Sequence, residues 1–206
     1  MKKTETYSMR FYITEETMKK SFGPKTLIFP PPVWVVGTYD SGGRPNIMTI
    51  AWGGICCSQP PCVAVSLRKA TYSFGNIVER KAFTINVPSE EQVKAADYVG
   101  MVSGKNQDKF SAGGLTPIRA EFVDAPYVKE FPMVLECRLF QTIEIGLHTQ
   151  FIGEVVDVKV EETALDEKGM PQIEKIRPIV FSPEIRAYHA IGKYIGQAFS
   201  IGKESA

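Results

Sequence analysis

The chain has few of the residues that mark metal centres or disulfide scaffolds. Its 206 residues include four cysteines and two histidines. The cysteines, Cys56, Cys57, Cys62 and Cys137, show neither C-x-x-C spacing nor the density of a disulfide framework. We therefore expect no metal site and reduced thiols in the core, where free cysteine is often found. If Cys56 and Cys57 belong to a strand, they should point to opposite faces.

Strong charge imbalance and long apolar runs are also missing. Lys and Arg number 24 against 23 Asp and Glu, which gives a net charge of +1. No basic block or Lys/Arg-rich helix marks a nucleic-acid surface. No apolar run approaches the roughly 18 residues of a membrane span, and no apolar segment follows the cations of Met1–Thr6. We expect a cytoplasmic protein that binds neither nucleic acid nor membrane.

The composition is that of an ordinary globular protein. It is 44% hydrophobic and 23% charged, so the chain can bury a sizeable core. It contains no internal repeat and no low-complexity segment. We expect a single domain over residues 1–206, with a barrel core at about 28–160, an N-terminal arm at 1–27 and a C-terminal extension at 161–206.

Most of the chain has the pattern of strands separated by short turns. A helix is expected at 71–81, with Phe74, Ile77 and Val78 on one face, and another at 93–102 after a capping box at Ser89–Gln92. Many strands with few helices predict an antiparallel barrel. The expected strands cover residues 33–39, 46–52, 62–67, 82–88, 133–145 and 151–160, with turns at 40–43 and 58–61.

Fingerprints of nucleotide-binding loops are absent. No G-x-G-x-x-G follows a strand, and Gly100–Asn106 fails as a P-loop because only three residues separate its glycines and Asn106 stands where Ser or Thr belongs. A nucleotide-like cofactor would have to be held by other means.

A short segment after the strand at 62–67 suits a phosphate group. Arg68 offers a planar fork for phosphate oxygens, and Lys69 offers a point charge. Hydroxyl donors follow at Thr71, Tyr72 and Ser73. If Thr71 or Ser73 caps the next helix, free backbone N–H groups and the helix dipole point to the same place. The alternative is a solvated strand end followed by an ordinary helix cap.

The strand at 46–52 suits a flat heteroaromatic ring. Asn46 and Thr49 lie beside an opening at 51–54, where backbone groups could reach the edge of a flavin. The alternative is plain core packing. Alternation places two sets of side chains on opposite faces: Met48, Ile50 and Trp52 on one, and Ile47, Thr49 and Ala51 on the other.

Six segments, in matching order over about residues 28–160, together resemble the flavin reductase-like, FMN-binding split-barrel family, most closely its flavoredoxin branch. The segments are 32–39, 46–52, 61–68, 83–88, Asp108–Phe110 and His148–Val155. The resemblance implies a mainly β protein, an antiparallel split β-barrel of Greek-key type with a few peripheral helices. It also implies a homodimer that binds FMN near the dimer interface.

The resemblance assigns expected roles to particular residues. His148 would lie near the flavin face, where it could orient a nicotinamide or position a proton donor; the alternative is a structural histidine. Lys109 would contact an anion, unless it is a solvated charge. Tyr188 and His189 would reach a partner subunit or lie in a C-terminal packing helix. The expected cofactor contacts are Asn46, Met48, Thr49, Ile50, Ala51 and Trp52 for the ring, Arg68, Lys69, Thr71, Tyr72 and Ser73 for the phosphate, and Asn86 and Lys109 as secondary contacts.

The expected activity is NAD(P)H-dependent flavin reduction, with a hydride passing from the nicotinamide to the flavin. Such chemistry belongs mainly to the cofactor, which agrees with the lack of a catalytic triad or paired carboxylates. The expected donor is NADH or NADPH, since no acidic or basic determinant for the 2′ position distinguishes them in the sequence. One alternative is a flavoredoxin-like electron carrier with a redox partner protein; a reductase could also supply a flavin-dependent monooxygenase. Another is a protein that senses a different phosphate ligand.

Overall fold

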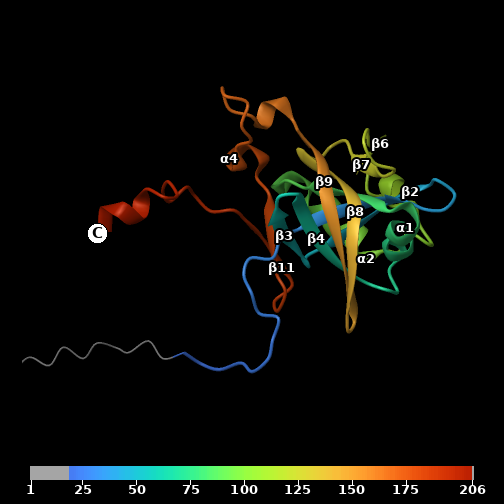
Figure 1. Cartoon of the computed structure of the whole chain (residues 1–206), viewed down its shortest axis with the longest axis horizontal. Coiled ribbons are helices and arrows are strands. Elements are labelled where there is room, and N and C mark those ends of the chain that lie inside the picture. The colour runs from blue at the N-terminus through green and yellow to red at the C-terminus, as the bar shows by residue number, and fades with distance from the viewer. Residues whose placement is uncertain (1–18, 206) are drawn as a thin grey trace, which may run out of the picture.

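A seven-stranded antiparallel sheet forms the body of the protein (Figure 1). The computed structural model describes residues 19–205, so most of the expected arm at 1–27 lies outside the described residues. The order of the strands is β2-β1-β5-β8-β9-β4-β3. Their bounds are β1 (Trp34–Tyr39), β2 (Pro45–Ile50), β3 (Gly53–Ser58), β4 (Pro61–Arg68), β5 (Ala82–Val87), β8 (Met133–Ile145) and β9 (His148–Val160).

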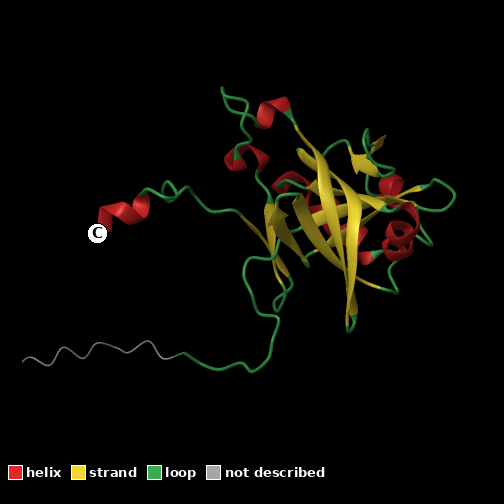
Figure 2. Cartoon of the chain, in the orientation of Figure 1, coloured by secondary structure: helices red, strands yellow, loops and turns green. Residues whose placement is uncertain are grey.

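Short helices and two hairpins surround this sheet (Figure 2). The hairpins are β6 (Pro117–Arg119) with β7 (Pro126–Val128), and β10 (Ile179–Ser182) with β11 (Ala187–Ala190). The predicted mainly β, antiparallel architecture with a few peripheral helices is confirmed. The helices are α1 (Tyr72–Arg80), α2 (Val93–Met101), α3 (Lys109–Ala112) and α4 (Ile173–Ile176), with 3-10 turns η1 (Glu90–Gln92), η2 (Glu162–Ala164) and η3 (Ile201–Ser205).

Two apolar clusters hold the sheet and its helices together. The first packs β1 and β2 against α2, through Val35, Ile47 and Val99. The second fills the space between β1, β4, β5 and β9, where Phe83 and Phe151 are fully buried. The second cluster also takes Ile77 from α1, so both longer helices are anchored to the sheet by their apolar faces.

Several local expectations were wrong. Val78 is 40% exposed, and α1 instead buries Ser73, Asn76 and Ile77. In β8 the single apolar face is interrupted, since register shifts follow Glu136 and Leu139 and residues 140–145 are exposed. No helix among residues 19–205 is long and apolar enough to cross a bilayer.

The return strand at 46–52 is shorter than expected. β2 ends at Ile50, a bend follows, and the new strand β3 begins at Gly53. The strands expected from the sequence did not include 53–58, a segment that opens with two glycines, which weaken a strand pattern. Gly53 is required here for a close approach: a Cβ at this position would lie 2.7 Å from the ring of Trp34.

The cysteines and the aromatic residues of the C-terminal extension agree only in part with what the sequence predicted. Cys62 and Cys137 are buried as expected, but Cys56 and Cys57 are exposed on the edge strand β3. Tyr188 and His189 lie in β11 rather than in a packing helix, because this segment pairs with β10.

Candidate functional site

A cavity of about 390 Å³ opens where β2 bends towards β3 and where β4 ends. We call this cavity the cradle. Its walls are mostly apolar, with a few polar side chains placed among them, as in typical ligand sites. It brings together residues from both halves of the predicted site. Those that line it are Met48, Thr49, Ile50, Ala51, Trp52, Arg68, Thr71 and His148.

Strand pairing explains why these residues meet. Arg68 at the end of β4 is the register partner of His148 at the start of β9. The backbone N–H of Ser66 donates to the carbonyl of Trp52 over 2.8 Å, which ties the bend after β2 to the middle of β4. The rings of Trp52 and His148 lie almost parallel, with an interplanar angle of 7° and centroids 6.1 Å apart. Both rings border the cradle.

One end of the cradle carries positive charge. Arg68 is exposed there, and Thr71 occupies the N-cap position of α1. The Thr71 hydroxyl donates to the carbonyl of Arg68 over 2.9 Å, and no side-chain cap serves the helix. The first N–H groups of α1 therefore have no side-chain cap, and its first turn holds no acidic residue. A guanidinium beside an uncapped helix N-terminus is suited to an anion.

The hydroxyls of Tyr72 and Ser73 do not line the cradle; they belong to a network behind this end. The Tyr72 hydroxyl donates to the carboxylate of Asp40 over 2.8 Å and accepts from Arg44 over 3.2 Å. The Ser73 hydroxyl accepts from the Asn46 amide over 2.9 Å. These contacts hold the start of α1 against β2. The role of Asn46, Tyr72 and Ser73 as cofactor contacts stays a prediction.

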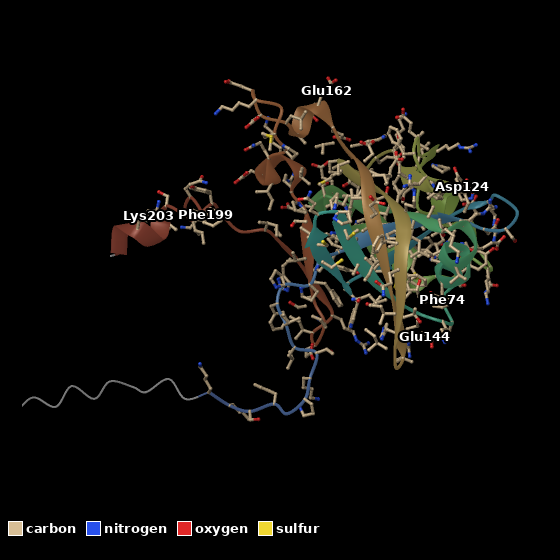
Figure 3. All side chains as sticks on the ribbon, viewed as in Figure 1. Phe74, Asp124, Glu144, Glu162, Phe199 and Lys203 are labelled. Carbon is tan, nitrogen blue, oxygen red and sulfur yellow. The ribbon has the colours of Figure 1, made fainter. Side chains whose placement is uncertain are left out.

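Asn46 and Lys69 are two more expected contact residues that do not line the cradle. Asn46 is buried, and its Oδ1 has no hydrogen-bond partner in the described part of the chain. Lys69 forms an exposed ion pair of 2.8 Å with Glu144 near the tip of the β8–β9 hairpin (Figure 3). Lys69 and Tyr72 line a neighbouring cavity of about 350 Å³, which shares Thr71 with the cradle.

Asn86 and Lys109 are not brought to the cradle either. The Asn86 amide donates to the Val35 carbonyl and accepts from the Val128 N–H, each over 2.8 Å. Lys109 is buried and donates to the Val99 carbonyl over 2.7 Å, so it is not the solvated charge of the alternative expectation. Burial lowers the pKa of Lys109 to about 8. These positions assign both side chains to internal packing; their role as secondary cofactor contacts stays a prediction.

Sequence reasoning missed part of the cradle wall. Asp97 and Met101 of α2 and Phe181 of β10 line it, together with Tyr188 of β11. The Tyr188 hydroxyl donates to the Asp97 carboxylate over 2.7 Å, and burial, then this carboxylate, raises the pKa of Tyr188 above its usual value. The only signal in the sequence was the presence of Tyr188 in the C-terminal extension. Among residues 19–205 no cluster of three or more His, Cys, Asp or Glu side chains is arranged to hold a metal ion.

A second cavity of about 670 Å³ lies beside the cradle. We call it the arm cavity, because residues 25–32 form one side of it and β3 residues 53–56 form the other. The two cavities share Ala51, Trp52 and Ser66. The cradle is therefore bordered by an open, apolar space.

Comparisons with known proteins agree with the fold described above. Residues 26–188 match the family model described as flavin reductase like domain. The fold superposes on flavoredoxin of Desulfovibrio vulgaris (Miyazaki F) with a TM-score of 0.87 and 57% identity, covering 90% of this chain and 100% of that one.

Two further structures are similar. Nitrilotriacetate monooxygenase component B from Bacillus cereus gives a TM-score of 0.75 at 25% identity, covering 82% of this chain and 88% of that one. A putative flavin reductase with a split barrel domain from Shewanella frigidimarina gives 0.76 at 24% identity, covering 84% and 87% respectively, which shows the fold. The split β-barrel expected from the sequence is confirmed.

Proposed function

Because the chain belongs to the flavin reductase like domain family, we propose that it binds FMN in the cradle and transfers electrons through it. The observation that carries the proposal is the cradle itself, in which an apolar, aromatic wall ends at Arg68 and the uncapped start of α1. The donor set fits the group: a flat ring needs apolar walls, and a phosphate needs a guanidinium and free N–H groups.

In this proposal, different parts of the cradle bind the phosphate and the ring of FMN. Arg68 and the first N–H groups of α1 hold the phosphate, and the backbone and side chains of 48–52 border the ring. The side chain of Thr49 is held in place beside the ring site, since its hydroxyl donates to the Ala96 carbonyl of α2. Bound FMN supplies a two-electron acceptor for hydride.

We further propose that NADH or NADPH is the electron donor. His148 and Trp52 form a parallel aromatic pair at the border of the cradle, where His148 would orient the nicotinamide. Support comes from the membership of the family and from the arm cavity, which leaves open space beside Trp52.

Steady-state oxidation of NADH and of NADPH with added FMN tests this donor. We expect turnover with at least one nucleotide, and His148→Asn should lower kcat about tenfold, the equivalent of about 1.4 kcal/mol of barrier. The flavin affinity should stay within about twofold, since the phosphate anchor is untouched.

The matched control is His189→Asn. His189 is the other histidine of the chain, is exposed, and contacts Ser182 rather than the cradle. It should leave kcat unchanged. Absence of nucleotide oxidation by the wild-type protein with either donor would exclude the reductase proposal.

A second candidate function is a flavoredoxin-like electron carrier, which the 57% identity with a flavoredoxin favours. A carrier would purify yellow, keep its FMN through dialysis and oxidise neither nucleotide alone. A reductase that uses flavin as a substrate would release it. A colourless protein that gains no thermal stability from FMN would exclude both and favour another phosphate ligand.

We also propose that the protein acts as a homodimer. Large apolar side chains remain exposed near the site, among them Trp52, Ile55 and Leu147. The C-terminal segment, with Phe199 95% exposed, runs away from the barrel (Figure 3). Sedimentation equilibrium should report twice the chain mass of 22.9 kDa; a mass of one chain at micromolar concentration would contradict the proposal.

A further inference from the structure

The hairpin of β3 and β4 gathers three of the four cysteines at its closed end. Ile55 pairs with Val63, but Cys57 pairs with Cys62, so the register shifts between Ile55 and Cys57. Two residues of β3, Cys56 and Cys57, therefore stand opposite Cys62 alone, which is the definition of a β-bulge. The bulge breaks the alternation from which we expected Cys56 and Cys57 to point to opposite faces.

The environments of these three thiols differ. Cys57 is exposed, and its thiol donates weakly to the Gln59 carbonyl over 3.4 Å, next to the turn. Cys62 is buried, and burial together with the nearby Cys56 and Cys57 raises its pKa. Cys56 is exposed and lines the arm cavity. One accessible thiol thus has a shielded thiol as its cross-strand partner.

The register of the hairpin is compatible with the Cα separation of a disulfide. Directly paired residues in an antiparallel ladder have Cα atoms about 4.5 to 5.5 Å apart. Disulfides span Cα separations of about 4.4 to 6.8 Å. Cys57 and Cys62 therefore need no change of strand pairing to become bonded. All four cysteines are free in this structure.

We propose that Cys57 and Cys62 form a redox-active dithiol that reacts with low-molecular-weight disulfides. The Cys57 thiolate attacks the small disulfide and releases one thiol, which leaves a mixed disulfide on Cys57. The Cys62 sulfur then attacks Cys57, loses its proton and releases the second thiol. The two protein thiols are oxidised by two electrons, and the small disulfide is reduced to two thiols.

This dithiol has a defined place relative to the cradle. Strand β4 carries Cys62 at one end and Arg68 at the other, and Ser66 of the same strand borders both cavities. The bond would lock the closed end of the hairpin that walls the arm cavity. Its formation depends on the two sulfur atoms alone and does not rest on the proposed flavin function.

Thiol counting in glutathione buffers tests the proposal on the full-length protein. Samples equilibrated from reduced to oxidised glutathione are quenched with acid, denatured and alkylated, and the alkylated cysteines are located by mass spectrometry. Wild type should lose two of its four alkylatable thiols, at Cys57 and Cys62, within one chain. Cys56→Ser should lose the same two.

Cys57→Ser should keep all three of its remaining thiols, whereas Cys62→Ala should trap glutathione as a mixed disulfide on Cys57, because the thiol that resolves it is missing. Cys57 is exposed, so Cys57→Ser gives a result even if the buried Cys62→Ala variant fails to fold. The proposal is overturned if wild type keeps four thiols at every ratio, or if Cys56→Ser prevents the bond. It is also overturned if glutathione stays attached to Cys57 in the wild-type protein, or if the disulfide joins two chains.

Discussion

Replacing Arg68 by alanine is expected to weaken FMN binding by about 10- to 100-fold, because a hydrogen-bonded charged partner contributes about 1.5 to 3 kcal/mol. Arg68 ends β4 at the positively charged end of the cradle, beside the uncapped start of α1. Its planar fork can bind two phosphate oxygens at once. Quenching of flavin fluorescence on titration with protein measures the change.

Three controls separate this interpretation from a general loss of charge. Riboflavin lacks the phosphate, so its affinity should be the same in wild type and in Arg68→Ala. Arg68→Lys keeps the charge without the fork and should give an intermediate loss. Lys69→Ala removes the adjacent cation, which pairs with Glu144 outside the cradle, and should change the affinity less than about threefold. Equal losses for FMN and riboflavin would contradict a phosphate contact at Arg68.

The predictable part of the site is the part encoded locally. Residues 48–52 cover the end of β2 and the bend after it, and residues 68–71 cover the end of β4 and the turn after it. Their residue types alone suggested a ring and a phosphate. The two halves are brought together by the Ser66–Trp52 hydrogen bond and by His148, which pairs with Arg68 from about eighty positions along the chain and lies parallel to Trp52. The family resemblance implied that His148 lies near the ring, but composition and periodicity could not predict its pairing with Arg68.

The remaining wall of the cradle depends on tertiary packing. Asp97 lies in an ordinary amphipathic helix and Tyr188 in a short hairpin, and only the fold brings them within 2.7 Å. The buried positions of Asn86 and Lys109 were equally invisible in the sequence, and their role as secondary cofactor contacts, which the family resemblance implies, stays a prediction. The fold buries both and satisfies them with backbone groups, because a buried polar group without a partner is costly.

The bulge in β3 shows a different limit of sequence reasoning. Alternation predicts that neighbouring strand residues face opposite ways, and one extra residue reverses that rule locally. Ile55 and Cys57 are two positions apart, yet their partners Val63 and Cys62 are adjacent. No residue pattern in 53–58 marks the shift, so the grouping of the thiols follows from the register and not from the sequence.

A carboxylate remote from the cradle should matter most for stability. Glu136 of β8 is fully buried and accepts from the N–H groups of Glu121 over 3.1 Å and Phe122 over 2.7 Å. It also pairs with Lys159 of β9 over 2.9 Å. It thereby fastens the loop before β7 to the centre of the sheet. Sequence patterns had placed the neighbours of Glu136 in an apolar strand and gave no sign of this anchor.

Replacing Glu136 by alanine is expected to lower the free energy of unfolding by about 3 to 5 kcal/mol, because it removes two hydrogen bonds to a charged acceptor, each contributing about 1.5 to 3 kcal/mol, and leaves the partly exposed Lys159 without its buried partner. Urea unfolding of the flavin-free protein measures this as a lower midpoint at an unchanged m-value.

Glu121→Ala is the matched control: its carboxylate also lies near Lys159, at 3.7 Å, but its side chain is 69% exposed. That control should cost less than about 1 kcal/mol. Folded Glu136→Ala protein should bind FMN with wild-type affinity, since Glu136 does not line the cradle. A loss no larger than that of Glu121→Ala would show that the loop is held by its other contacts.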